Sequence, residues 1–464
     1  MTLASQQTTD HGVTGPGPVM PGTAEAKAFL EDFGILSSFG ATDAGGVHRP
    51  AATTSHTDSR MWLIGRLREF GLEVIVDGVG NVYGTATVIP GAPYVLIGSH
   101  TDSQPTSGRF DGAYGVLAAA HAVAHVSARV QEGSLSPTVN LAVVDWFNEE
   151  GARFQPSIMG STTFTGARDA ASTLDVNDVQ GTSVRQALTD SGFLGDDEPP
   201  ECCGYAEIHI EQGRILECEG LQIGVVTGGW TATKMTVEVI GAQGHTGATD
   251  MSDRHDALVG AARVVLAARA IADRHAHRAD RAKVFTAVAR LLLEPESPGV
   301  IASKATVSVD LRSDSPELVP VVAEEFHRSL TEIAADGEVD LRVHSEYLRA
   351  GATYAPVGIE VAEQVADELR LSHRRMLTRA GHDSVPLSEV VPTVMLFVPS
   401  VEGVSHHEAE YTHDDDLLRG LSVLRGVAER MVCGAVIDAD RPHRSPLMSS
   451  PERRASGKGA VTAR

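Results

Sequence analysis

The stretch IGSHTDSQPTSGRFDG, residues 97–112, contains residue types that could do chemistry. It places His100, Asp102 and Asp111 directly after the apolar run YVLIG, among small and glycine residues. Imidazole and carboxylate groups gathered in this way are typical of a metal site. Three further apolar runs lead to candidate ligands of the same kinds, namely Asn148-Glu149-Glu150, His209 with Glu211, and His406-His407.

A set of imidazoles and carboxylates without a thiolate predicts zinc, or manganese or cobalt. The candidates outnumber the ligands of one tetrahedral ion, and two ions about 3.5–4 Å apart need an anion between them. Asp111, on the glycine-flanked turn RFDGAYG, is placed to be this bridge. A water shared by two such ions loses a proton near neutrality, and a carboxylate that is not a ligand can accept it. Of Glu149 and Glu150, one can bind metal while the other serves as this base.

The elements that must position these residues alternate between strands and helices. YVLIGSH and TVNLAVVDW predict buried strands, and GAYGVLAAAHAVAHV between them predicts a helix that is apolar around most of its circumference. MWLIGRLREFG predicts an amphipathic helix, and LEVIVDGVGNVYGTA predicts a hairpin. This order predicts an α/β fold with a mostly parallel sheet and helices on both faces. Ligands bind beyond the carboxyl ends of such strands, which is where the four stretches fall.

The middle of the chain has a different pattern. TKMTVEVIGAQG, ATVSVDLRS and VDLRVHSEYL alternate as half-exposed strands do, and two long helical patterns separate them. We therefore expect a smaller α+β domain at 229–347, inserted into a discontinuous catalytic metal-binding domain at 23–228 and 348–440. Residues 1–22 and 441–464 are expected to be a flexible N-terminus and a disordered tail, because they are polar and lack an apolar period.

The composition limits the partners. The chain has 464 residues and a formal net charge of −23, which argues against nucleic acid and anionic membranes. Four cysteines without a C-x-x-C pair indicate a reducing compartment rather than a disulfide framework. The first residues lack the basic and apolar regions of a secretory signal, and no apolar run approaches the ~20 residues of a membrane helix. These features predict a cytoplasmic protein.

Six ordered segments resemble one known family: GSHTDSQPTSGRFDGAYGVL, FNEEGARFQPSIMGS, EIHIEQGRILE, VIGAQGHTGATDMSDRHDAL, RAGHDS and FVPSVEGVSHHEAEYT. The chain resembles the dinuclear-metal amidohydrolases that include N-carbamoyl-L-amino-acid hydrolases, β-ureidopropionases and allantoate amidohydrolases. These are relatives of the zinc aminoacylases and carboxypeptidase-G-type exopeptidases. The resemblance implies a zinc-exopeptidase-like fold, an inserted dimerisation or lid domain and a homodimer. It also implies two divalent ions per subunit, with zinc preferred over manganese, cobalt or nickel.

The resemblance implies a metal-binding role for five residues. One ion takes His100 and His209, the other takes Glu150 and His406, and Asp111 bridges the two. His406 is chosen over His407 because the family's last metal histidine lies in an S-H-x-x-x-E pattern, which Ser405, His406 and Glu410 match.

Other residues are implied to act on the substrate or on the ligands. Glu149 is the general base, and Asp102 holds the outer nitrogen of His100. His245 of the inserted domain reaches a neighbouring active site and stabilises the oxyanion. The residues implied to bind substrate are Gln212, Arg312 and His382. Simpler interpretations stay open: a turn cap for His245, a surface charge for Arg312 and a helix N-cap for His382.

The implied activity is hydrolysis of a linear C–N amide bond by metal-bound hydroxide. The implied substrate is a small ureido compound with a carboxylate, such as an N-carbamoyl-L-amino acid, allantoate or ureidoglycolate. Gly299, Ala302 and Glu408 depart from the family pattern and bear on the choice of substrate. The alternatives are an N-acyl-amino-acid amidase or dipeptidase on the same fold, and a non-catalytic metal-binding homologue. A serine hydrolase is excluded because the sequence has no G-x-S-x-G elbow.

Overall fold

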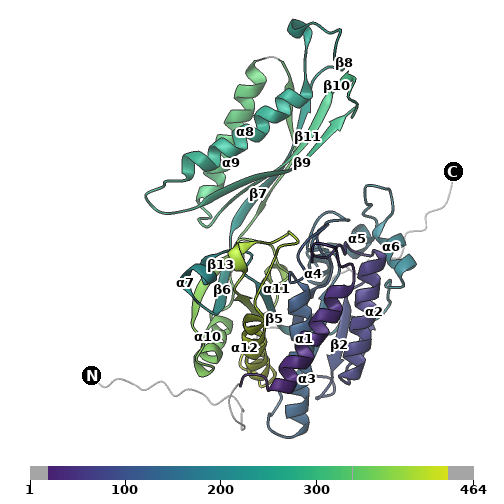
Figure 1. The fold of residues 1–464 in the computed structure, drawn as a ribbon, viewed down its shortest axis with the longest axis vertical. Coiled ribbons are helices and arrows are strands. Elements are labelled where there is room, and N and C mark those ends of the chain that lie inside the picture. The colour runs from purple at the N-terminus through teal and green to yellow at the C-terminus, as the bar shows by residue number, and fades with distance from the viewer. Residues whose placement is uncertain (1–18, 337, 437–464) are drawn as a thin grey trace, which may run out of the picture. The chain divides into compact units, whose positions relative to one another are not determined.

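A computed structural model describes residues 19–336 and 338–436 (Figure 1). Most of the N-terminus expected to be flexible, and the whole of the expected tail at 441–464, lie outside the described residues. Contacts divide the chain into two compact units. Unit 1 comprises the described residues up to Val226, Tyr354–Arg375 and the described residues from His382 onward, and unit 2 comprises Thr227–Thr353 and Met376–Gly381. Met376–Gly381 thus belongs to unit 2, although it lies within the range 348–440 expected for the larger domain.

Unit 1 alternates strands and helices as the sequence predicts. Its elements are α1 (Thr23–Ser38), α2 (Thr54–Glu69), β1 (Glu73–Val76), β2 (Val82–Ala86), β3 (Tyr94–His100), α3 (Ala113–Gln131), β4 (Asn140–Trp146), α4 (Met159–Phe164), α5 (Ala170–Leu174), α6 (Val184–Ser191), β5 (Cys202–Ile210), α7 (Ile215–Glu219), α10 (Pro356–Glu368), α11 (Ser384–Ser388), β14 (Thr393–Val398) and α12 (Asp414–Val432). Strands β6 (Ile223–Gly229) and β13 (His373–Thr378) each run from one unit into the other.

These strands form one sheet in the order β1-β2-β4-β3-β5-β14-β6-β13. The central pairs β4–β3, β3–β5 and β5–β14 are parallel, and β1–β2, β2–β4 and β14–β6 are antiparallel. Helices α3 and α12 pack against the central strands, and Phe164 of α4 and Leu387 of α11 join a core cluster with Leu96 and Trp146. The predicted α/β class, with a mostly parallel sheet covered by helices, is confirmed.

Unit 2 is a smaller α+β structure. Its elements are β7 (Thr231–Ile240), β8 (Gly244–His245), the 3₁₀ helix η1 (Met251–Asp253), α8 (Ala257–His275), β9 (Val284–Glu294), β10 (Val300–Ile301), β11 (Lys304–Ser313), α9 (Leu318–Ala335) and β12 (Asp340–Arg349). The four-stranded antiparallel sheet has the order β12-β7-β11-β9, and β8 pairs with β10. Val237 and Val307 of the sheet share a buried core with Val264 of α8 and Phe326 of α9.

The sequence predicted three strands here and missed β9. Its residues VFTAVARLLLE alternate only over the first half, and the register against β11 shifts between Ser308 and Val309. A bulge of this kind breaks the two-residue period on which strand prediction depends.

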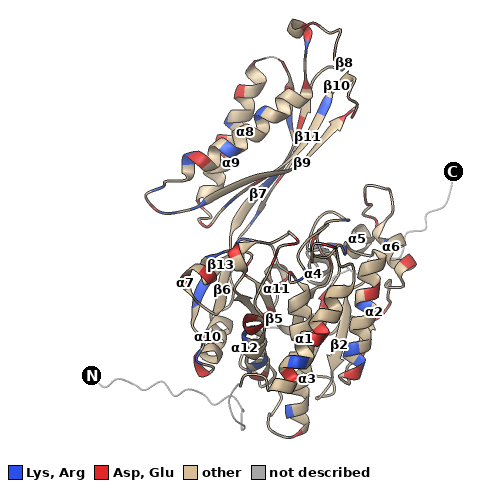
Figure 2. Ribbon diagram, viewed as in Figure 1, with Lys and Arg blue, Asp and Glu red and all other residues tan. Residues whose placement is uncertain are grey.

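Charged residues of both signs lie along α1 and α2, as Figure 2 shows. Among the described residues, no helix combines the length and apolarity that crossing a membrane requires.

Candidate metal centre

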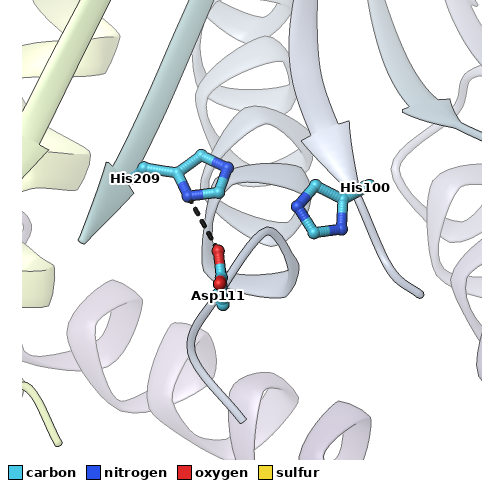
Figure 3. A group of neighbouring side chains, drawn as sticks. All are labelled: His100, Asp111 and His209. Atoms are coloured by element: carbon cyan, nitrogen blue, oxygen red, sulfur yellow. Dashed lines mark ion pairs between the residues drawn. The ribbon is translucent and has the colours of Figure 1, made fainter. Parts of the chain in front are cut away.

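Two histidines meet at the carboxyl ends of neighbouring parallel strands. His100 is the last residue of β3 and His209 is the penultimate residue of β5, and each is only 1% exposed. Asp111 lies on the loop that enters α3 and faces both rings (Figure 3). Gly112 follows with φ +66°, and a Cβ at this position would lie 2.3 Å from Cε1 of His100. A residue with a side chain would therefore clash with the imidazole that Asp111 faces.

The first candidate ligand group is His100, Asp111 and His209, whose ligand atoms all lie within 4.8 Å of one another. His209 Nδ1 is 3.1 Å from Oδ1 of Asp111. This nitrogen is buried, and no described residue gives it a well-aligned hydrogen bond. A buried ring nitrogen that faces a carboxylate and a second imidazole without a well-aligned hydrogen bond suits a metal ligand.

The second group is Asp111, Glu150 and His406. His406 Nε2 is 3.3 Å from Oδ2 of Asp111 and 3.5 Å from Oε2 of Glu150. The two oxygens of Asp111 thus face different groups: Oδ1 faces His209 and Oδ2 faces His406. This arrangement is what a bridging carboxylate requires.

Asp102 organises the turn after β4. Its carboxylate accepts the backbone N–H of Glu149 at 3.1 Å and that of Glu150 at 3.3 Å. His100 Nδ1 lies 2.9 Å from the backbone oxygen of Asp102 and 3.7 Å from its carboxylate. The outer nitrogen of His100 is therefore held by the Asp102 carbonyl more closely than by the side chain named in the sequence analysis. Glu149 Oε2 lies 3.6 Å from His100 Nε2 and belongs to neither ligand group.

The electrostatics of these groups call for positive charge. Burial raises the pKa of Glu149 well above its usual range, and the nearby carboxylates of Asp383 and Glu150 raise it further. Burial likewise raises the pKa of Glu150 to about 7, with Asp111 adding to the shift. Burial opposes the charge on His209, yet the carboxylates of Asp111 and Glu207 raise its pKa to about 10. Without metal, these carboxylates and this imidazole therefore favour their protonated forms. Divalent cations could bind to the same lone pairs in place of the protons.

The outer nitrogen of His209 is held by residues that the sequence analysis did not find. Ser99 Oγ lies 2.7 Å from His209 Nε2 and donates to Glu207 Oε1 at 2.8 Å. Glu207 is fully buried and accepts the backbone N–H of Ser384 at 2.7 Å. His382 lies beside this group, with its ring centroid 4.6 Å from that of His209, and burial lowers its pKa to about 3. Glu207, at alternate spacing with His209 on one strand, was the available sequence signal.

Two further residues that the sequence analysis did not assign hold the ligand loops. Gln104 donates from its backbone N–H to Oε1 of Glu150 at 3.2 Å and from its side-chain amide to Oε2 at 3.0 Å. Glu410 accepts the backbone N–H groups of Phe110 and Asp111, each at 3.1 Å, and the hydroxyl of Ser405 at 2.9 Å. Glu410 therefore joins the loop of Asp111 to the loop of His406.

The other candidates near the strand ends have local partners. Gln212 donates from Nε2 to Oδ2 of Asp111 at 2.6 Å. Glu211 accepts two backbone N–H groups at the start of α7, both at 2.7 Å, and so has a structural role. Glu408, one of the departures from the family pattern, accepts a hydrogen bond from Thr42.

His245 and Arg312 lie in unit 2 and have partners there. His245 belongs to β8 and is exposed, and its Nδ1 accepts the backbone N–H of Gly247 at 3.0 Å. Arg312 lies on β11 and forms a two-point pair with Asp310, at 2.8 and 2.6 Å. Arg312 Nη1 also donates to the backbone oxygen of Arg379 at 2.7 Å.

Comparisons with known proteins agree on one group of enzymes. Residues 96–430 match the family described as Peptidase family M20/M25/M40. A Mycolicibacterium smegmatis protein named as a hydrolase without a stated substrate is 45% identical, over 91% of this chain and 96% of its own length. The N-carbamoyl-L-amino-acid amidohydrolase of Rhizobium meliloti is 31% identical, over 84% of this chain and 92% of its own. The ureidoglycolate hydrolase of Arabidopsis thaliana is 32% identical, over 87% and 86%.

A solved structure shows the same fold over nearly the whole chain. The hydantoinase/carbamoylase family amidase from Burkholderia vietnamiensis has a TM-score of 0.81 at 32% identity, covering 89% of this chain and 98% of that chain.

Proposed function

Because this chain belongs to peptidase family M20/M25/M40 and is a hydrolase of C–N bonds other than peptide bonds, we propose that it cleaves a linear ureido bond. The proposed substrate is a carboxylate-bearing small molecule such as an N-carbamoyl-L-amino acid, allantoate or ureidoglycolate. The observation that carries the proposal is the division of Asp111 between two ligand groups, with Glu149 next to one of them but in neither.

The donor set fits two divalent cations, zinc first and manganese, cobalt or nickel otherwise. His100 and His209 would hold one, Glu150 and His406 the other, and Asp111 both. When bound, the cations would acidify a water between them and polarise the substrate carbonyl.

Glu149 is the proposed general base. It is 7% exposed, and burial raises its pKa, so that it holds an accepted proton more readily than a solvated glutamate does. It takes a proton from the attacking water and delivers it to the leaving nitrogen. The C–N bond then breaks, and a carbamoyl substrate yields ammonia, carbon dioxide and the amine.

The substrate contacts are proposed from the resemblance and from the chemistry of the groups. The resemblance assigns Gln212, Arg312 and His382 to substrate binding, and a guanidinium such as that of Arg312 suits a planar carboxylate. His245 stabilises the negative charge on the attacked carbonyl oxygen, and a homodimer supplies it from the neighbouring subunit.

The test combines metal analysis with a screen for ammonia release over carbamoyl amino acids, allantoate and ureidoglycolate. We expect two divalent ions per chain and ammonia from at least one ureido compound. Acetyl and dipeptide analogues are measured in parallel, and faster cleavage of these would support the amidase or dipeptidase alternative. Two bound ions without turnover of any substrate would instead favour the non-catalytic homologue.

A further inference from the structure

Gln104 makes an unusual set of contacts with one proposed ligand. Its backbone N–H donates to Glu150 Oε1 at 3.2 Å, and its side-chain Nε2 donates to Glu150 Oε2 at 3.0 Å. The same Nε2 lies 3.1 Å from the backbone oxygen of Glu150. One residue, 46 positions away in the chain, thus contacts both carboxylate oxygens and the backbone of Glu150.

These contacts decide where the Glu150 carboxylate points. Glu150 is only 9% exposed, so little water is available to stabilise its charge in other rotamers. The amide of Gln104 is neutral, so it stabilises the carboxylate without competing for a cation. Oε2, which Gln104 Nε2 holds, is also the oxygen 3.5 Å from His406 Nε2. Gln104 therefore holds Glu150 in the geometry of the second ligand group.

In the part of the chain that the structure describes, Gln104 makes these contacts with Glu150 and no comparable contact with the first ligand group. His100 Nδ1 is held by the Asp102 carbonyl, and His209 Nε2 by Ser99 and Glu207. Removal of the Gln104 amide would leave those contacts in place. The two cation positions should therefore respond differently.

We propose that Gln104 is a positioning residue that sets the affinity of the second cation position, formed by Asp111, Glu150 and His406. The inference rests on the proposed dinuclear centre. Loss of a residue that orients a metal ligand typically weakens metal binding by about 10–100-fold. We expect this loss at one of the two positions only.

The experiment uses Gln104→Met, which keeps the length of the side chain and removes its donors. The full-length chain is first freed of metal with a chelator. It is then titrated with Zn²⁺ and separately with Mn²⁺ by calorimetry, and bound metal is counted after desalting. We expect the wild type to retain two ions. The variant should retain one ion with near-wild-type affinity and bind the second about 10–100-fold more weakly. Excess metal should restore kcat, because Gln104 touches no reacting atom.

Gln186→Met is the matched control, because Gln186 also donates to a carboxylate, Asp190 Oδ1 at 2.7 Å, but on the exposed surface of α6. It should bind both ions like the wild type. Thermal unfolding of the chelated proteins separates positioning from general destabilisation, and Gln104→Met should match the control. Gln104→Ala repeats the measurement with a shorter side chain, and the same selective loss is expected.

Equal weakening of both ions, or no weakening in either Gln104 variant, overturns the role of Gln104 while leaving a two-ion wild type intact. A loss of kcat that persists with both positions filled also overturns it. A wild-type chain that binds fewer than two ions refutes the dinuclear centre itself, and the inference with it.

Discussion

Glu410 provides a quantitative test of how the centre is assembled. Its side chain is 4% exposed, and its Oε1 accepts two backbone N–H groups, those of Phe110 and Asp111. Glu410→Ala leaves both donors buried without an acceptor. Each such donor costs about 1–3 kcal/mol, so the free energy of unfolding should fall by about 2–6 kcal/mol. Gly108 leaves room for the wild-type carboxylate, because a Cβ there would lie 2.1 Å from Oε1 of Glu410.

Glu410→Gln separates hydrogen bonding from charge. The amide oxygen can accept the same two N–H groups, and the amide nitrogen can donate to the hydroxyl of Ser405, which now contacts Oε2 at 2.9 Å. This variant should therefore stay within about 1 kcal/mol of the wild type, near the value of a single neutral hydrogen bond.

The assay is urea unfolding of the protein after its metal has been removed with a chelator. Bound metal is then counted after metal has been added back. Glu402→Ala is the control, since Glu402 lies exposed in the same loop as His406. The alanine variant at 410 should unfold earlier and retain less metal, whereas the glutamine variant should do neither. The reasoning is refuted if Glu410→Ala matches Glu402→Ala, or if Glu410→Gln is as damaging as Glu410→Ala.

Three further outcomes are expected. Glu149→Gln should lower kcat by about 10²–10⁴-fold while both ions stay bound, and loss of metal would instead make Glu149 a ligand. His406→Ala should remove the second ion and His407→Ala should not, as metal counting will show. The metal-free protein should lose stability as pH rises from 6.5 to 9. In the folded protein the pKa of Glu150 is raised from 4.5 to about 7, so the stability that its protonation contributes is lost as pH rises through that range. The pKa values of His209 and His406 are raised from 6.5 to about 10 and about 9, so the stability that their protonation contributes is lost above pH 6.5. Denaturant midpoints at several pH values, with and without zinc, measure this slope, and a midpoint that rises with pH without metal would contradict it.

The meeting of distant residues at one sheet edge could be predicted because it depends on topology. His100 and His209 lie at the carboxyl ends of neighbouring parallel strands, and parallel strands bring these ends to one edge. Apolar runs identified the strands, and the histidine or acidic residues that follow them identified their carboxyl ends. No knowledge of side-chain contacts was needed for that step.

The supporting contacts could not be predicted in the same way. Gln104 contacts a residue 46 positions away, and Glu410 contacts one 300 positions away. Neither residue lies on a regular strand or helix, so no period reveals which way its side chain points. Such contacts depend on how the loops fold back, which short-range patterns do not determine.

The neighbouring acids Glu149 and Glu150 show what the loop geometry adds. The sequence leaves open which of them binds metal, since both follow the same strand. The backbone turns sharply before them, with Asn148 at φ +53°, a left-handed conformation that asparagine tolerates better than most residues. Asp102 accepts the N–H groups of both acids and so fixes the turn, while Gln104 directs Glu150 toward His406. The Glu149 carboxylate instead lies 3.6 Å from Nε2 of His100. Two identical side chains thereby acquire different environments, because a neutral amide holds the Glu150 carboxylate whereas the Glu149 carboxylate lies beside an imidazole.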